Sequence, residues 1–537
     1  MPRLAQVPVF VAALLAAFTL VLPAEALAQT ERTGRTPGGA YYRLLVPDGW
    51  TPADGLVIWN HGFHLGPPEP RPSLGPLVDV QLAQRYALAA SSYSLNGWAL
   101  FRTLDDNREL VDEFVSAFGV PDQIFVTGAS LGGTVTAQAI EADDLGNVVG
   151  ALSLCGAVAG SRQWDAALDL RLLYDAVCGD VPGAAIPGGA EGLPYPPDPR
   201  LDELELLERV VICTGALLPE VLRSSGQIRR RDLLLELTGI PDEEFLLTDL
   251  GYATFGLSDL IHDPRKLDGA NAFTNALVAY GDPAIDAEIE RVIADPEARR
   301  RLLDNFTPTG DVGEVKIVSL HTDQDGLVVV ENTTEYAAVV PATQLTTGIV
   351  VEDEPSHCGF SDAELLAAWE SLRGWVAGGR QPSAGDLQAT CESLAGTGAA
   401  AGPCRIDPGF VAPELEGRIR PRGGACVEDE DTLCLGTGDR FRVELVWEDF
   451  EGKSGPGRTT PFQTGDSGSF WFFDPSNVEV FVKVLDARAL NGRFWVFYGS
   501  LTNVGFELVV TDTETGVARV YANAPGVFAS AGDTDAF

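Results

Sequence analysis

Short apolar runs rich in β-branched residues alternate with helical patterns from about residue 39 to residue 378. Apolar runs of about four to eight residues between turn residues are typical of buried strands, and their alternation with helices indicates a mostly parallel sheet. Strands are expected over 41–46, 55–60, 87–92, 123–127, 148–154, 314–320 and 345–351. Apolar residues spaced three and four apart predict helices over 99–118 and 362–376. The pattern therefore predicts an α/β domain with a doubly wound sheet.

This alternation stops between about residues 156 and 313, where helical segments flank the Pro/Gly-rich stretch 179–200. An ordinary connection between consecutive strands is much shorter, so we expect the insertion to form a helical cap over the sheet. After residue 376 the chain is predicted to be a loop as far as residue 405.

From about residue 405 to residue 537, helical periodicity is replaced by short aromatic and β-branched runs separated by Gly, Asn and Asp. The runs cover 441–447, 470–473, 478–485, 494–498, 506–510 and 518–522. Several short strands at near-regular spacing predict a second, all-β domain of sandwich type or a small barrel. The aromatic runs are expected mainly to pack its core, with contact to a surface, glycan or polymer as the alternative.

Residues 1–28 have the pattern of a secretory signal, with Arg3, an apolar stretch over 7–22 and the small-residue site Ala26-Leu27-Ala28. The apolar stretch is shorter than the ~20 residues that span a bilayer, so a membrane anchor is the weaker interpretation. We therefore expect a secreted protein, extracellular or periplasmic, with no stable membrane insertion. The predicted organisation is a signal peptide over 1–28, an α/β domain over 29–404 and a β-domain over 405–537.

The formal net charge of −40 over 537 residues argues against nucleic acid as a partner, because phosphate binding requires clustered Lys and Arg. Eight cysteines in an exported chain indicate disulfides, and the short separations favour Cys391–Cys404 and Cys426–Cys434. The partners of Cys155, Cys178, Cys213 and Cys358 stay open. Only five histidines and no Cys-x-x-Cys occur, so no metal site is expected.

The strongest chemical signal is Gly128-Ala129-Ser130-Leu131-Gly132-Gly133, between the expected strand 123–127 and a helical stretch that starts at Thr134. A nucleophilic serine at a sharp strand-to-helix turn needs small neighbours two residues before and two after, here Gly128 and Gly132. The alternative is a tight turn with a structural serine. The context favours Ser130 as a nucleophile.

A serine hydroxyl needs a base to remove its proton and an acid to orient that base. On this type of scaffold the acid and then the base follow the nucleophile, and the histidines after Ser130 are His262, His321 and His357. His357 lies between the last expected strand and the last helix, where the base belongs. His262, inside the cap, and His321, at the end of a strand, are expected to be structural.

The acid is expected in the turn that follows the strand 314–320. Asp325 precedes Gly326 and lies far enough past the strand to reach back to the imidazole, with Asp323 as the alternative. Both residues also suit ordinary turn chemistry. Acyl transfer further needs donors for the oxyanion. We expect the N–H groups of Leu131, directly after the nucleophile, and of Phe63, in the loop after the expected strand 55–60.

With His61-Gly62, Gly128-Ala129-Ser130-Leu131-Gly132, Asp325 and His357 in this order, residues 39–378 resemble the α/β-hydrolase superfamily. The resemblance implies an esterase or lipase-like serine hydrolase that uses an acyl-enzyme and no cofactor. The pair His357-Cys358 resembles the tannase and feruloyl esterase group, in which a cysteine before the serine is bridged to one after the histidine. Here Ala129 stands in place of that first cysteine.

We therefore expect a carboxylic ester hydrolase that acts on a small-molecule or polymeric ester. A serine peptidase of the prolyl-oligopeptidase type and a non-catalytic binding protein are the alternatives. Aromatic residues of the cap are candidates for lining an apolar pocket, although the cap's own core is an equally good place for them. They are Trp164, Tyr174, Tyr195, Tyr252, Phe255, Phe273 and Tyr280.

Overall fold

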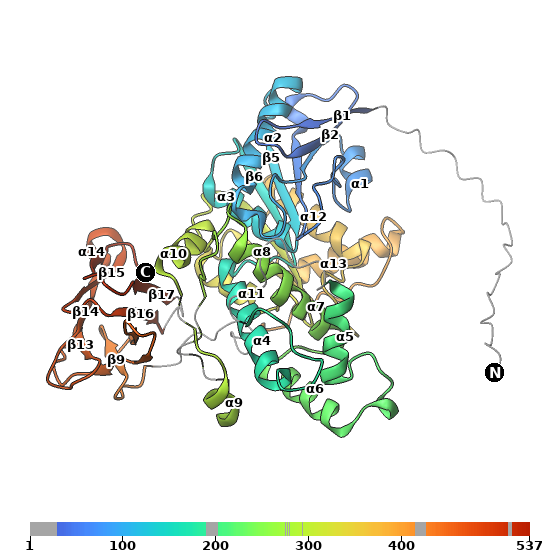
Figure 1. Cartoon of the computed structure of the whole chain (residues 1–537). Helices are drawn as coiled ribbons and strands as arrows, with labels where there is room; N and C mark the ends of the chain where they lie inside the picture. Colours follow the sequence, from blue (N-terminus) through green and yellow to red (C-terminus); the bar gives the residue numbers. More distant parts are fainter. Residues whose placement is uncertain are drawn as a thin grey trace, which may run out of the picture.

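The computed structural model describes residues 29–189, 202–413, 426–513 and 518–537, apart from 274, 276, 277, 279 and 293. The expected signal peptide, residues 1–28, lies outside the described residues, as does Tyr195. Within these ranges the chain forms an upper α/β layer, a helical cap below it and a β-domain at one side (Figure 1).

The α/β part is built on an eight-stranded sheet of order β1-β2-β4-β3-β5-β6-β7-β8. β1 and β2 are antiparallel to their neighbours, and β4, β3, β5, β6, β7 and β8 run parallel. The strands are β1 (Gln29–Arg35), β2 (Tyr41–Pro47), β3 (Leu56–Asn60), β4 (Ala87–Ser91), β5 (Ile124–Ala129), β6 (Val148–Leu154), β7 (Lys316–Thr322) and β8 (Leu345–Val350). The mostly parallel sheet is confirmed, and β1 is an edge strand that the exposed, polar run Gln29–Arg35 did not reveal.

Helices cover both faces of this sheet, which confirms the doubly wound arrangement. α1 (Val78–Ala83) and α12 (Asp362–Val376) pack on one face, where Trp369 is fully buried. α2 (Thr103–Phe118) and α3 (Leu131–Ala142) pack on the other, where Leu110 and Phe114 are fully buried. α11 (Asn332–Val339) connects β7 to β8. Short 3-10 helices are η1 (Pro52–Asp54), η2 (Ala99–Phe101), η3 (Gly160–Arg162) and η5 (Glu220–Leu222).

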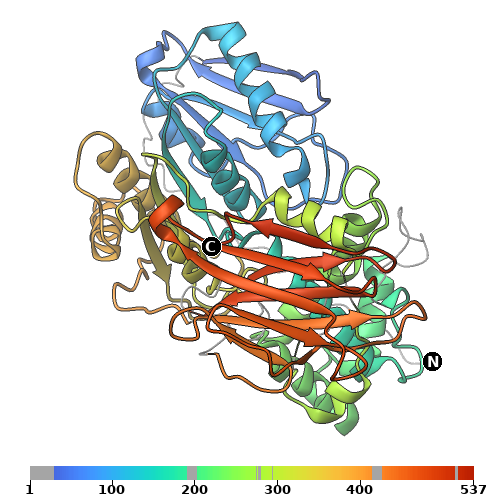
Figure 2. The ribbon, with the colours of Figure 1, turned by 90° about the vertical axis from the view of Figure 1, so that its left-hand side faces the viewer.

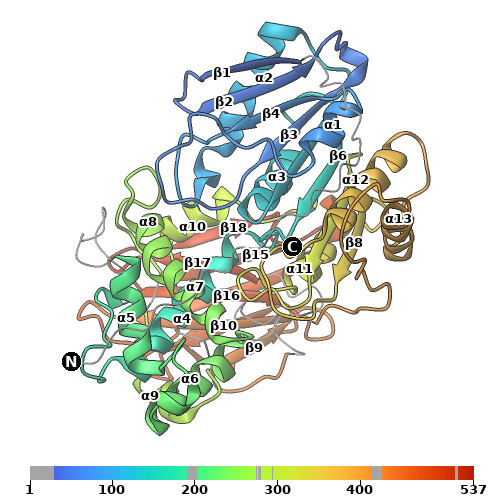
Figure 3. The ribbon, with the colours of Figure 1, turned by 90° about the vertical axis from the view of Figure 1, so that its right-hand side faces the viewer.

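The segment between β6 and β7 is helical in its described parts, as expected, and lies below the sheet (Figure 3). A buried cluster that includes Leu168, Tyr174 and Leu246 packs its helices together, and the disulfide Cys178–Cys213 joins α4 to α5. A π-helix, Tyr252–Gly256, continues α7 into α8. The cap helices are α4 (Gln163–Cys178), α5 (Glu203–Thr214), α6 (Ser225–Thr238), α7 (Glu243–Gly251), α8 (Leu257–His262), α9 (Pro283–Glu288) and α10 (Pro296–Asn305).

In its described residues the β-domain consists of two antiparallel sheets of five strands each, which confirms the all-β expectation. Its strands lie in front of the α/β part and the cap in Figure 2. One sheet holds β9 (Thr432–Leu435), β10 (Phe441–Glu448), β11 (Ser454–Pro456), β16 (Gly505–Asp512) and β17 (Ala518–Asn523). The other holds β12 (Arg458–Thr459), β13 (Ser467–Trp471), β14 (Val480–Ala487), β15 (Arg493–Ser500) and β18 (Ser530–Asp533), with α14 (Arg488–Asn491) between β14 and β15. β17 contacts α10 of the cap.

Each aromatic run of the β-domain divides between the two faces of its sheet, because successive side chains of a strand point in opposite directions. Phe470 and Phe494 are buried in the core between the sheets. Phe473 is exposed, and Trp471 and Trp495 are half-buried. The runs therefore form part of the core and also part of the surface.

The segment 377–405, expected to be a loop, contains the helix α13 (Ala384–Thr397). That expectation was wrong because the helix has few apolar residues, of which Leu387 and Cys391 are buried. Its start is marked instead by a capping box of Ser383 and Asp386. Residues 405–407, expected to begin the β-domain, still hydrogen bond to β8 and the residue after it. Val351 N–H donates to Arg405 O, and Asp407 N–H donates to Ile349 O.

The structure contains four disulfides, and the expected bridges Cys391–Cys404 and Cys426–Cys434 are confirmed. The two pairings that the sequence left open are Cys155–Cys358 and Cys178–Cys213. In the described part of the chain, every helix is too short or too polar to span a lipid bilayer.

Candidate active site

Ser130 lies at the sharp turn between β5 and α3. Its φ is +56°, a conformation that non-glycine residues seldom adopt. The turn is crowded: a Cβ on Gly128 would collide with the carbonyl of Gly132, and a Cβ on Gly132 would collide with the carbonyl of Asn60. Both glycines are therefore required by close backbone approach, which is the reason inferred from the sequence.

The structure brings Ser130, His357 and Asp325 into one hydrogen-bonded chain. His357 Nε2 lies 2.9 Å from Ser130 Oγ, and His357 Nδ1 lies 2.7 Å from Asp325 Oδ2. A carboxylate accepts and cannot donate, so Nδ1 carries the proton and Nε2 is left to accept from the serine hydroxyl. This arrangement can remove the proton from Ser130.

Asp325 is fixed from its other side by the backbone. Its Oδ1 accepts hydrogen bonds from the N–H groups of Leu327 at 3.0 Å and Val328 at 2.9 Å, and its side chain is fully buried. His357 is 25% exposed, so the imidazole lies between a buried carboxylate and an accessible hydroxyl.

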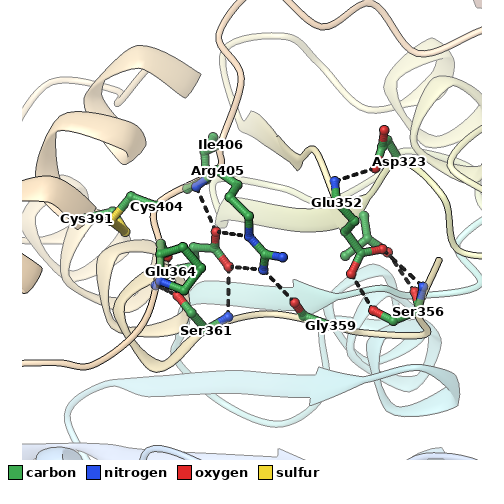
Figure 4. Close-up of polar contacts among 12 residues, drawn as sticks. Asp323, Glu352, Ser356, Gly359, Ser361, Glu364, Cys391, Cys404, Arg405 and Ile406 are labelled. Carbon is green, nitrogen blue, oxygen red and sulfur yellow. Dashed lines mark hydrogen bonds and ion pairs between the residues drawn. A yellow bond between two sulfur atoms is a disulfide. The ribbon is translucent and has the colours of Figure 1, made fainter. Parts of the chain in front are cut away.

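The other sequence candidates lie elsewhere. Asp323 Oδ1 accepts from the N–H of Glu352 at 2.8 Å (Figure 4). His321 is fully buried at the end of β7, its Nδ1 lies 3.0 Å from Thr322 O, and burial lowers the pKa of its imidazole. His262 ends α8 in the cap. Neither histidine has a hydrogen bond to Ser130 in the part of the chain that the structure describes.

The two residues expected to supply oxyanion donors flank Ser130. Leu131 opens α3, and the N–H groups of a helix's first turn have no intrahelical acceptor. Phe63 follows Gly62, where an added Cβ would lie 3.4 Å from Ser130 Cβ and 3.8 Å from Ser130 Oγ. The loop after β3 therefore lies directly against the nucleophile.

The loop that carries His357, residues 351–361, is held on both sides by polar contacts (Figure 4). Before the histidine, the Glu352 carboxylate accepts from the hydroxyl of Ser356. After it, Arg405 Nη2 donates to Gly359 O at 2.8 Å and to the buried Glu364 carboxylate at 3.0 Å. The disulfide Cys391–Cys404 fixes the residue next to Arg405.

A disulfide also ties this loop to the sheet. Cys358 is bonded to Cys155, which directly follows β6, and Cys358 Sγ lies 3.6 Å from His357 Nε2. Cys155, His357 and Cys358 hold three potential metal ligands within 4.8 Å of one another, but the two sulfurs are bonded to each other. The bridge after the histidine thus ends directly after β6, the strand next to β5, and not on the residue before Ser130.

A cavity of ≈ 540 Å³, counted with its mouth, opens at Ser130 between sheet and cap. Its wall is almost wholly apolar, and two of its aromatic residues, Trp164 and Tyr252, are among the cap candidates. Trp164 contacts Phe63 and Trp98 with ring centroids 6.0 and 5.6 Å apart. The lining residues are Phe63, Trp98, Ser130, Leu131, Ala157, Trp164, Ala167, Asp249, Tyr252, Leu327 and Val328.

The remaining cap candidates in the described residues belong to the cap's own packing. Tyr174, Phe273 and Tyr280 are buried there, and Phe255 packs against the same cluster. Trp98 was missed as a pocket residue. It lies on the loop after β4, and loops at the carboxyl ends of parallel strands border ligand sites, so its position was the available signal.

No protein-family model and no curated protein matches the chain. Among solved structures, an esterase RhEst1 from Rhodococcus sp. ECU1013 aligns with 17% identity and a TM-score of 0.30, covering 65% of this chain and 98% of its own. The rice cell wall degrading esterase LipA from Xanthomonas oryzae aligns with 13% identity and a TM-score of 0.30, covering 65% of this chain and 87% of its own. Candida antarctica lipase A in its closed state aligns with 12% identity and a TM-score of 0.32, covering 68% of this chain and 86% of its own.

Proposed function

We propose that the chain is an exported serine hydrolase of the α/β-hydrolase type that cleaves carboxylic esters. The observation that carries this proposal is the hydrogen-bonded chain from Ser130 Oγ through His357 to Asp325. Those three groups come from the carboxyl ends of β5, β7 and β8, where ligand sites of parallel sheets lie.

In the first half of the reaction, Ser130 Oγ attacks the ester carbonyl carbon while its proton passes to His357 Nε2. The carbonyl oxygen becomes an oxyanion and is held by the N–H groups of Leu131 and Phe63. When the tetrahedral intermediate collapses, the bond to the alcohol oxygen breaks and that oxygen takes the proton from Nε2. The acyl group stays on Ser130.

In the second half, water attacks the acyl carbon and gives a proton to His357 Nε2. Collapse then breaks the bond to Ser130 Oγ, which recovers its proton, and the carboxylic acid leaves. Asp325 Oδ2 accepts from Nδ1–H throughout and stabilises the imidazolium. No cofactor takes part in this cycle.

The cavity at Ser130 supports an ester with an apolar group. Its walls are mostly aromatic and aliphatic side chains from the loops after β3, β4, β6 and β7, the start of α3 and the cap, together with Ser130 and the side chain of Asp249. A polar or charged group against the apolar part of this wall would lose its hydration without compensating partners. The peptidase alternative shares the chemistry and requires an amide substrate.

Export is proposed from the signal pattern together with the oxidised cysteines. Four disulfides join cysteines between 8 and 203 residues apart, and such bonds persist in oxidising compartments.

The test is labelling of the intact protein by a fluorophosphonate, together with hydrolysis of p-nitrophenyl esters of rising chain length. Ser130→Ala is expected to lose labelling and to lower kcat by about 10⁶-fold, the size seen when a hydrolase nucleophile is removed. Ser476→Ala, an exposed serine of the β-domain, is the matched control and keeps both.

The same measurements separate the alternatives. Faster turnover of aminoacyl p-nitroanilides than of the esters would establish the peptidase. A well-folded wild-type protein that neither takes the label nor cleaves esters would indicate a binding protein and overturn the proposal.

A further inference from the structure

The backbone of the loop after β3 is contacted by the side chains of His61 and Tyr93, which the proposed reaction does not use. His61, Gly62 and Phe63 lie against the nucleophile, and the side chain of Phe63 lines the cavity. The direction of the Phe63 N–H therefore depends on what holds the backbone of this short loop.

The side chain of His61 fixes the peptide between Gly62 and Phe63. His61 Nδ1 lies 2.8 Å from Gly62 O, so a proton on Nδ1 is donated to that carbonyl. In a trans peptide the carbonyl and the following N–H point in opposite directions. Holding Gly62 O beside the imidazole thus keeps the N–H of Phe63 turned the other way. Burial lowers the pKa of His61, against hydrogen bonds to the backbone of Gly62 and Ser92 that raise it. In the neutral ring, the tautomer with its proton on Nδ1 is the one that donates to Gly62 O.

Tyr93, in the loop after β4, holds His61 in turn. The two rings stack with centroids 4.1 Å apart and an interplanar angle of 25°, and Tyr93 Oη donates to His61 O at 3.1 Å. The ring and the carbonyl of one residue are thereby fixed by one side chain. Burial raises the pKa of Tyr93, so its hydroxyl remains a donor at any working pH.

Tyr93 is itself a rigid support. It is buried, and its φ is +54°, which an L-residue adopts only where its surroundings enforce it. Its N–H donates to Ser91 Oγ, and its carbonyl accepts from Ser92 Oγ, both at 3.1 Å. Strain of this kind at a site is expected where a fixed geometry serves a function.

We propose that Tyr93 and His61 are positioning residues that orient the Phe63 N–H toward the oxyanion, Tyr93 by holding His61 and His61 by holding Gly62 O. The inference rests on the proposed ester hydrolysis. Neither side chain touches the reacting atoms, so both act on the transition state through the backbone.

The first test compares Tyr93→Phe with Tyr174→Phe in the full-length protein. Both tyrosines are buried and both donate to a backbone carbonyl, Tyr174 to Ala184 O at 2.9 Å within the cap. Removing an oxyanion donor costs about 10²–10³-fold in kcat, so misdirecting one is expected to cost about 10–100-fold. Tyr93→Phe should lower kcat by that factor and leave KM near the wild-type value. It should weaken the binding of a trifluoromethyl ketone inhibitor in parallel with kcat, because the adduct of that inhibitor carries an oxyanion. Tyr174→Phe should change neither kcat nor the affinity for the trifluoromethyl ketone.

The second test uses His61→Asn and His61→Leu. The side-chain amide of Asn places a donor near the position of Nδ1, whereas Leu fills similar space without a donor. Asn is expected to retain most of kcat and of trifluoromethyl ketone affinity, and Leu to lose both. A structural role alone would predict similar losses, or none, in the two variants.

Two results would overturn the inference: equal effects of Tyr93→Phe and Tyr174→Phe on kcat and inhibitor affinity, or equal effects of the two His61 variants. If the wild-type protein cleaves esters and either result is found, the inference fails while the proposed function stands. If the wild-type protein neither cleaves esters nor takes a fluorophosphonate, both fail together.

Discussion

The two carboxylate oxygens of Asp325 have different partners. Oδ1 accepts from two backbone N–H groups, and Oδ2 faces His357 Nδ1. The side chain cannot rotate without giving up the backbone contacts, so the oxygen that faces the imidazole is fixed. Asp325 thus differs from Asp323 in facing the imidazole, because Asp323 Oδ1 accepts from the N–H of Glu352.

Asp325→Asn should preserve the fold and lower kcat by about 10⁴-fold. Loss of the acid in a serine triad has an effect of this size because the imidazole then adopts the wrong tautomer. The Asn oxygen keeps the two backbone contacts, so the amide nitrogen faces Nδ1 and forces it to accept. The measurement is kcat for a p-nitrophenyl ester, with circular dichroism as the folding check. Asp323→Asn is the control and should retain wild-type kcat. The reverse order of the two variants would assign the acid to Asp323.

Asp106 on α2 makes stability depend on pH. Burial raises the pKa of its carboxyl to about 6, partly opposed by hydrogen bonds from the N–H and hydroxyl of Ser94. The unfolded chain has an Asp pKa of about 3.9, so between these values unfolding releases a proton and stability falls as pH rises. The difference between the two pKa values corresponds to about 3 kcal/mol.

Asp106→Asn keeps an acceptor for Ser94 and removes the titration. Its free energy of unfolding, relative to wild type, should therefore increase between pH 4 and pH 7 by about 3 kcal/mol and then stay level. Urea unfolding across this range measures the difference. Parallel curves for the two proteins would contradict the assignment.

The loop between β8 and α12 is the element on which the position of His357 depends. The disulfide Cys155–Cys358 joins this loop to the end of β6 across 203 residues. Replacing both cysteines by Ala should lower kcat by about 10–100-fold, because a displacement of about 1 Å in an active site costs up to ~10²-fold.

The matched control is removal of Cys426–Cys434, which closes only 8 residues in the β-domain. It should leave kcat unchanged. Calorimetry provides a second readout, since a crosslink over the longer segment stabilises by up to about 5 kcal/mol and the short one by less. Unchanged kcat in the Cys155/Cys358 variant would show that Arg405 and Glu352 hold the loop without the bridge.

The π-helix between α7 and α8 shapes the cavity through Gly256. A Cβ there would lie 2.8 Å from Trp164 Cη2 and 3.4 Å from Phe63 Cζ. Gly256→Ala should therefore push these rings into the cavity, cost about 1–3 kcal/mol, and raise KM for esters with bulky apolar groups more than for acetates. Gly251→Ala at the end of α7 is the control, because its Cβ would have no neighbour within 4 Å among the described residues. A uniform rise in KM across all esters would contradict this model of the cavity.

Elements with a strong local pattern were predictable, and pairings between distant elements were not. The alternation of apolar runs led to seven strands of the sheet, and the glycines around Ser130 led to the turn because their requirement is local. The order of the chain pointed to His357 and Asp325. By contrast, α13 was missed because its buried positions are few.

The bond between Cys155 and Cys358 could not be read from the sequence, because four cysteines allow three pairings and separation along the chain does not choose among them. The cavity required the tertiary structure for the same reason. Trp98 and Trp164 meet there from different elements, and only their packing shows that both border Ser130.

At the scale of the whole molecule, the dominant property is charge. The chain has 77 acidic and 37 basic residues, and so a net charge of −40. Like charges repel more strongly in the compact folded state than in the expanded chain, which destabilises the fold at low ionic strength. Salt shortens the screening length from about 30 Å at 0.01 M to about 3 Å at 1 M.

Tm at pH 7.5 should therefore rise steadily as NaCl is increased, and calorimetry measures that slope. The control is the same measurement at a pH where the Asp and Glu side chains are partly protonated. Near the sequence pI of 4.3 the net charge vanishes, so the repulsion that salt would screen is largely gone. The slope of Tm against salt should then be much smaller at pH 4.5 than at pH 7.5. Equal slopes at both pH values would mean that NaCl acts on hydrophobic burial, which does not depend on net charge.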